Sequence, residues 1–61
     1  MSAENEAYAE GTRLLKALAA LRNDVVNINA SDTQCKDEAL RLIEQSRERL
    51  KEALTVLSGL V

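Results

Sequence analysis

Apolar residues along this chain recur at alternating spacings of three and four positions in two separate segments. In the first segment the recurring positions are Ala7, Gly11, Leu14, Leu18, Leu21, Val25 and Ile28. In the second segment they are Ala39, Ile43, Ser46, Leu50, Ala53, Leu57 and Leu60. A sustained period of about 3.5 residues is typical of helices packed side by side at a shallow angle. The pattern predicts an all-α protein with helices at residues 4–27 and 32–58, and it places these residues along the seam.

A polar stretch from Asn27 to Ser31 separates the two segments, and Asn residues disfavour a helix interior. Ser31 followed by Gln34 matches a capping box, so we expect Ser31 to cap the second helix. A connection this short brings consecutive helices back alongside each other. The sequence therefore predicts an antiparallel helical hairpin that forms one domain over residues 1–61.

The chain carries more apolar side chains than one seam between two helices can bury. Further apolar residues flank both predicted seams, and they include Tyr8, Leu15, Leu40, Leu42, Leu54, Val56 and Val61. In an isolated hairpin each large flanking side chain would forgo about 1.5–3 kcal/mol of burial. We therefore expect self-association into a four-helix bundle or a higher helical oligomer. The predicted oligomer interface consists of Leu15, Leu18, Leu40, Leu42, Leu54, Val56, Leu57 and Val61.

The composition points in the same direction. The 61 residues include no Pro, Phe, Trp or His, one Tyr and one Cys. A monomeric domain this small usually needs aromatic bulk, disulfides or a metal to hold its core, and this chain offers none of them. The net charge of −2 divides evenly, with −1 in residues 1–30 and −1 in residues 31–61. Nucleic-acid binding normally requires a clustered basic face, so nucleic acid is not an expected partner.

The sequence also predicts a location. No apolar run approaches the roughly 20 residues that cross a bilayer, so no membrane contact is expected. The acidic N-terminal stretch has neither the basic nor the apolar region of a secretion signal. A single Cys agrees with a reducing compartment. We expect a cytoplasmic protein.

Catalysis has almost no candidate residues here. The chain has no His base, no nucleophile paired with a base, no glycine-rich phosphate loop and no metal-ligand spacing. Glu44, Glu48 and Glu52 fall on one helical stripe, but they alternate with Arg and Lys, which is typical of a solvated, salt-bridged face. We predict a non-enzymatic protein without cofactor or metal.

Tyr8 is the main candidate for ligand recognition. Its ring could stack on a base while Arg13 and Lys16, within about two turns, bind phosphate. The alternative is that the ring covers the end of the bundle. Gly11 costs about 1 kcal/mol in a helix interior relative to Ala. It either permits close approach of a neighbouring helix or leaves room for a ligand beside Tyr8.

Two polar or reactive residues have open interpretations. Cys35 is either a small apolar core residue packed against Ala30 or a reactive thiol near a helix N-terminus. Ser46 is either a tolerated small residue of the seam or a device that sets the helix register.

The segments Thr12-Arg13-Leu14-Leu15-Lys16-Ala17-Leu18-Ala19-Ala20-Leu21 and Ala39-Leu40-Arg41-Leu42-Ile43-Glu44-Gln45-Ser46 carry one family resemblance. They are similar to the two helices of small phage-encoded proteins that sequester cyclic oligonucleotide immune signals, the type II anti-CBASS sponges. This resemblance implies a ligand between subunits, and side-chain chemistry nominates Tyr8 for stacking and Arg13 or Lys16 for phosphate. In size and architecture the chain also resembles the plasmid repressor of primer, whose hairpins dimerise into a four-helix bundle that binds RNA loops.

Three functions follow as hypotheses. The first is a phage-type inhibitor of host defence that sequesters a nucleotide signal at subunit interfaces. The second is a protein–protein inhibitor or adaptor that docks on a host protein through its apolar helix flank. The third is an RNA-binding regulator of the repressor-of-primer kind.

Overall fold

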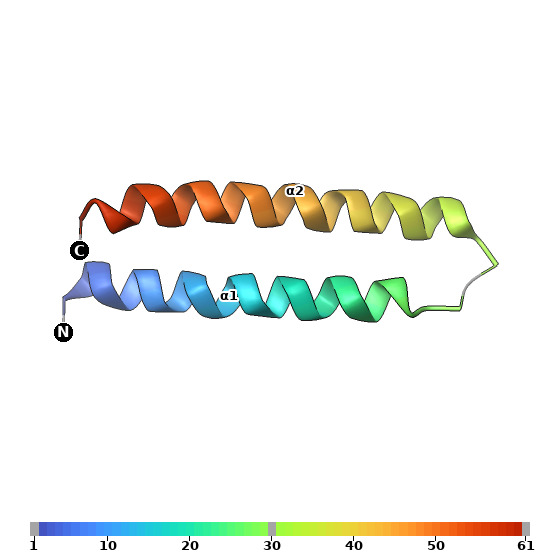
Figure 1. The fold of residues 1–61 in the computed structure, drawn as a ribbon, viewed down its shortest axis with the longest axis horizontal. Coiled ribbons are helices and arrows are strands. Elements are labelled where there is room, and N and C mark those ends of the chain that lie inside the picture. The colour runs from blue at the N-terminus through green and yellow to red at the C-terminus, as the bar shows by residue number, and fades with distance from the viewer. Residues whose placement is uncertain (1, 30, 61) are drawn as a thin grey trace.

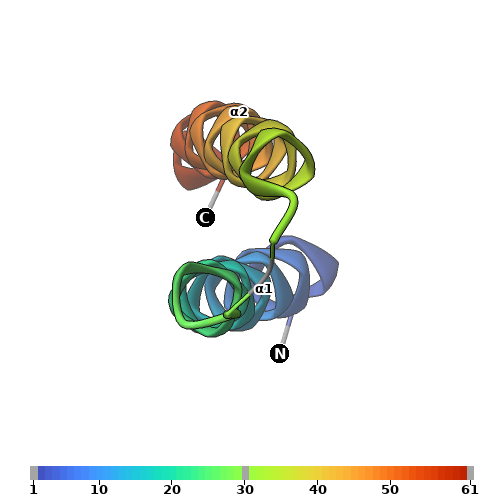
Figure 2. The same cartoon turned by 90° about the vertical axis from the view of Figure 1, so that its right-hand side faces the viewer.

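A computed structural model describes residues 2–29 and 31–60 of the chain. Two helices, α1 (Ala3–Val26) and α2 (Thr33–Ser58), run antiparallel, with both chain ends at the same end of the hairpin (Figure 1). Viewed from the loop end, the described part of the chain is a single pair of helices with no third element over either broad side (Figure 2). The predicted all-α hairpin is confirmed, and the helix bounds agree with the prediction to within one residue.

The predicted cap of α2 is wrong by one residue. Asp32, rather than Ser31, caps α2, because its Oδ1 accepts the backbone N–H of Cys35 at 3.1 Å. A carboxylate at this position is favoured both by the hydrogen bond and by the positive end of the helix dipole. The hydroxyl of Ser2 does the same for α1, accepting the N–H of Asn5 at 3.1 Å.

The seam between the helices is rotated relative to the predicted one. Seven predicted seam residues are exposed instead: Ala7, Leu14, Leu21, Ile28, Ser46, Ala53 and Leu60. The buried or half-buried apolar residues with large side chains are Leu15, Leu18 and Val25 on α1 and Leu40, Ile43, Leu50, Leu54 and Leu57 on α2. Leu15, Leu40 and Leu54 thus lie in the seam within one chain, although the sequence pattern placed them on its outer flanks.

Gly11 explains much of this rotation. It is buried against Leu54, the one apolar side chain among the described residues that is more than nine-tenths buried. A Cβ built on Gly11 would lie 2.5 Å from Cδ2 of Leu54, so the missing side chain is what lets α2 pack here. Close helix approach, one of the two interpretations of Gly11, is confirmed.

A charged cluster crosses the seam nearer to the loop. The Nε of Arg22 on α1 lies 2.7 Å from Oε1 of Glu44 on α2, and Arg47 Nη1 lies 3.0 Å from the same oxygen. Arg41 pairs with Glu38, and Lys51 with Glu48, so the predicted salt-bridged face of α2 is present. The contacts Gly11–Leu54 and Arg22–Glu44 together define how the two helices are aligned.

Candidate interaction surface

The rotated seam leaves one broad side of the hairpin apolar. Six large apolar side chains of this side remain exposed: Leu14, Leu21, Ile28, Leu42, Val56 and Leu60. Val56 and Leu60 are exposed to 72% and 65%. Leu14 and Leu21 are seven residues apart and therefore lie on one line of α1, and Ile28 lies in the loop that follows this helix. We call the two lines from α1 and α2 together the apolar face.

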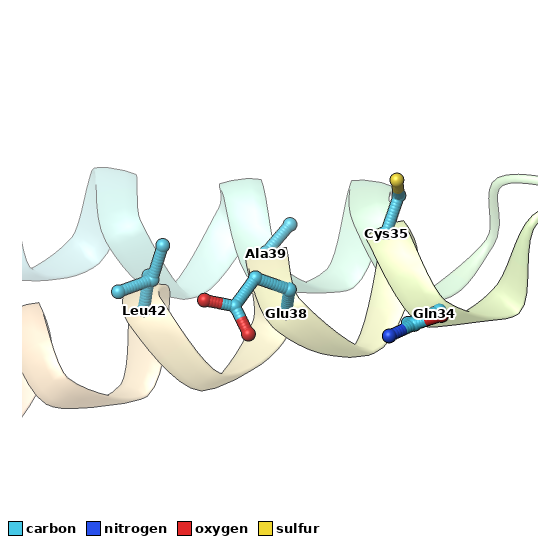
Figure 3. A pocket seen from close by; sticks show the side chains of 5 residues that line it. All are labelled: Gln34, Cys35, Glu38, Ala39 and Leu42. Atoms are coloured by element: carbon cyan, nitrogen blue, oxygen red, sulfur yellow. The ribbon is translucent and has the colours of Figure 1, made fainter.

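Both helices contribute to this face, as the grooves near the loop show. One groove of about 350 Å³ is lined by Val25 from α1, by Ile28 and Asp32 from the loop, and by Cys35, Lys36 and Ala39 from α2. A neighbouring groove of about 460 Å³ shares Cys35 and Ala39 and continues to Leu42. In Figure 3 Cys35 and Ala39 point toward the same side of α2 from successive turns. The apolar face is therefore continuous between the helices at this end.

The predicted oligomer interface divides into three groups in the structure. Leu42 and Val56 lie on the apolar face. Leu15, Leu18, Leu40, Leu54 and Leu57 lie in the seam within the hairpin. Val61 is outside the described residues. Sequence reasoning missed Leu14, Leu21 and Leu60 as surface residues because their spacing fits a seam equally well.

Cys35 lies at the edge of this face and is exposed. Its thiol donates a hydrogen bond to Oδ2 of Asp32 at 3.1 Å, and this contact, with some desolvation, raises the pKa of Cys35. The hydrogen bonds from the backbone N–H and the thiol of Cys35 lower the pKa of the Asp32 carboxyl. Because the raised pKa keeps the thiol protonated, the geometry does not favour a reactive thiolate. The predicted contact with Ala30 lies outside the described residues.

The predicted ligand residues are not gathered into one site. Arg13 extends from α1 to pair with Glu10, with 2.6 Å between Nη1 and Oε2. Tyr8 and Arg13 are five positions apart, which places them about 140° apart around the helix. Lys16, eight positions after Tyr8, is about 80° away on the same basis and more than two turns along. The structure leaves Tyr8 without either predicted cation beside it.

Tyr8 does have a cationic neighbour that sequence reasoning missed. It lines a groove of about 370 Å³ together with Leu15, Leu54, Lys51, Thr55 and Ser58. The Lys51 amine is half-exposed and lies 3.4 Å from Glu48. This Tyr8 groove is on the side of the hairpin away from the apolar face, since Tyr8 and Leu14 are about 120° apart around α1. The sequence alone could not predict this neighbour, because the proximity of Tyr8 and Lys51 depends on how the two helices are aligned.

The described residues contain no group of three His, Cys, Asp or Glu side chains that could hold a metal. Neither α1 nor α2 is long and apolar enough to span a membrane. Comparisons with protein-family models, curated proteins and solved structures find no match to this chain.

Proposed function

We propose that this protein is a non-catalytic, homo-oligomeric binding protein whose basic unit is a pair of hairpins. The two hairpins pack through their apolar faces and form a four-helix bundle. The observation that carries this proposal is the continuous apolar face, which spans both helices while the seam buries little. Leu14 at 52%, Ile28 at 50% and Val56 at 72% exposure gain burial only if something covers them.

The size of the apolar face fits a second copy as the occupant. The hairpin extends over 47 Å along the helices and 16 Å across them. The footprint of a whole side is therefore comparable to the roughly 800 Å² that each partner contributes to a standard protein–protein interface. Two copies related by a two-fold axis contact each other through the same face, so one set of residues forms both halves of the interface. This pairing gives each hairpin the core that it lacks alone.

The first prediction concerns thermal unfolding. If folding is coupled to pairing, mass action makes the melting temperature depend on protein concentration. We expect the midpoint followed by circular dichroism to rise by about 5 °C for each tenfold increase in concentration. A midpoint that stays constant over a hundredfold range would contradict pairing and leave the apolar face to a different protein partner.

A second candidate function, sequestration of a nucleotide, is supported by the Tyr8 groove. The groove offers an aromatic ring for stacking, the Lys51 amine for phosphate and the hydroxyls of Thr55 and Ser58. Both hydroxyls donate within α2, to the carbonyls of Lys51 and Thr55, so their oxygens remain able to accept. In a dimer formed through the apolar faces, the two grooves open outward rather than between the subunits.

The nucleotide proposal predicts a thermal shift with cyclic dinucleotides. We expect Tyr8→Ala to weaken the ligand affinity about 5- to 150-fold and so reduce the shift, because stacking is worth about 1–3 kcal/mol. Lys51→Ala should also reduce the shift, because it removes the cation that would bind phosphate. Arg13→Ala is the matched control on the same helix and should retain the shift. Equal loss in Arg13→Ala, or no shift in the unsubstituted protein, would reject the Tyr8 groove as the site.

A further inference from the structure

Large and small side chains alternate along the α2 part of the apolar face. At every seventh position one line carries Cys35, Leu42, Arg49 and Val56. The neighbouring line carries Ala39, Ser46, Ala53 and Leu60. The side chains of the first line are large except for Cys35, and those of the second line are small except for Leu60. When two copies of α2 pack antiparallel, each small side chain of one line faces a large side chain of the other line. The pattern is therefore complementary to itself.

We infer that the second copy lies with its loop at the opposite end of the bundle. The inference rests on the proposed pairing of apolar faces and adds how the partner is oriented. A two-fold axis that crosses α2 between positions 47 and 48, perpendicular to the helices, packs α2 against α2 of the second copy. The facing pairs are then Leu42 with Ala53, Val56 with Ala39, Leu60 with Cys35 and Arg49 with Ser46. Every pair joins a large and a small side chain, as close packing of facing helices requires.

The α1 helix gives an independent check of this axis. The contacts Gly11–Leu54 and Arg22–Glu44 align the two helices. On that alignment, the axis between positions 47 and 48 of α2 crosses α1 close to positions 17 and 18. The same rotation then sets Leu14 against Leu21 of the second copy. Because α1 was not used to place the axis, this apolar contact supports the orientation separately.

Arg49 distinguishes this orientation from the alternative in which both loops lie at the same end. In the alternative, α2 packs on α1 of the second copy, and Arg49 is level with Ala17, which offers no acceptor side chain. In the proposed orientation Arg49 meets Ser46 of the second copy. The Ser46 hydroxyl donates to the carbonyl of Leu42 at 2.9 Å, so its oxygen is free to accept from a guanidinium. The proposed orientation therefore gives Arg49 an acceptor on the second copy.

The natural Cys35 makes the orientation testable by disulfide formation. In the proposed dimer the two Cys35 residues are about 37 Å apart, at a rise of 1.5 Å per residue, and cannot be joined. We expect Leu60→Cys to give a covalent two-chain species under mild oxidation, whereas the unsubstituted protein stays non-covalent. A helical pair in a Cys35→Ser background, Leu42→Cys with Ala53→Cys, should cross-link in the same way, since these residues are too far apart within one helix.

Three outcomes separate the claims. Covalent dimers from both designed variants confirm the orientation. A covalent dimer from the unsubstituted protein or from Ile28→Cys, without one from the designed variants, would establish loops at the same end and overturn it. The mass of each variant before oxidation is measured in parallel. Two chains without the designed cross-links would reject the orientation alone, and a one-chain mass would reject the proposed pairing itself.

Discussion

Replacing Leu54 by Ala is expected to remove a large part of the protein's stability. Leu54 is the most buried apolar side chain among the described residues, at 8% exposure, and it fills the space that Gly11 leaves open. Removing a buried Leu costs about 2–5 kcal/mol. A chain of this length has a total stability of only about 3–9 kcal/mol. Urea unfolding followed by far-ultraviolet circular dichroism should therefore show a much lower midpoint.

Thr55→Ala is the matched control, because Thr55 is the exposed neighbour of Leu54 on the same helix. It should change the free energy of unfolding by less than about 0.5 kcal/mol. A urea midpoint unchanged by Leu54→Ala would show that the seam is not centred on this residue.

The contact between Gly11 and Leu54 can be measured separately by a double-mutant cycle. Gly11→Ala gains about 1 kcal/mol in helix propensity but adds a Cβ 2.5 Å from Leu54, where overpacking costs about 1–3 kcal/mol. In the Leu54→Ala background that clash is gone, so the same substitution should stabilise. Equal effects of Gly11→Ala in both backgrounds would contradict the close approach.

Val56→Glu is expected to dissociate the proposed dimer. Val56 is the most exposed of the large apolar residues of the apolar face, at 72%, and the substitution places a carboxylate there in both copies. Loss of about 1.5–3 kcal/mol from each copy raises the dimer dissociation constant at least about 100-fold. Sedimentation equilibrium should show the mass falling to one chain at micromolar concentration, together with a lower helix content.

Thr55→Glu provides the control for charge at the same level of α2. Thr55 lines the Tyr8 groove, away from the apolar face, so its replacement should leave the two-chain mass unchanged. If Thr55→Glu dissociates the protein and Val56→Glu does not, the hairpins pair through the side that carries Tyr8.

The presence, length and direction of the helices could be predicted because those properties are local. Heptad spacing and the short polar break at Asn27 to Ser31 depend only on neighbouring residues. The N-cap was misplaced by one residue because Ser31 and Asp32 are both good caps. Only the observed bond from the Cys35 N–H to Asp32 distinguishes them.

The rotation of the helices could not be predicted from the same pattern. Each helix carries two adjacent apolar lines, such as those of Leu14 and Leu15 on α1, and either line fits a seam. The choice depends on contacts between helices, namely the fit of Leu54 on Gly11 and the pairing of Arg22 with Glu44. The placement of Lys51 beside Tyr8 follows from that alignment, so it could not be predicted from the sequence either.

Pairing of the hairpins is tested by measuring mass and helicity on the same sample of the unsubstituted protein. Sedimentation equilibrium and circular dichroism are recorded together over a dilution series from about 100 µM to the lowest detectable concentration. Pairing through the apolar faces predicts a mass of two chains at high concentration and a loss of helicity that accompanies dissociation. A one-chain mass with undiminished helicity at micromolar concentration would contradict it.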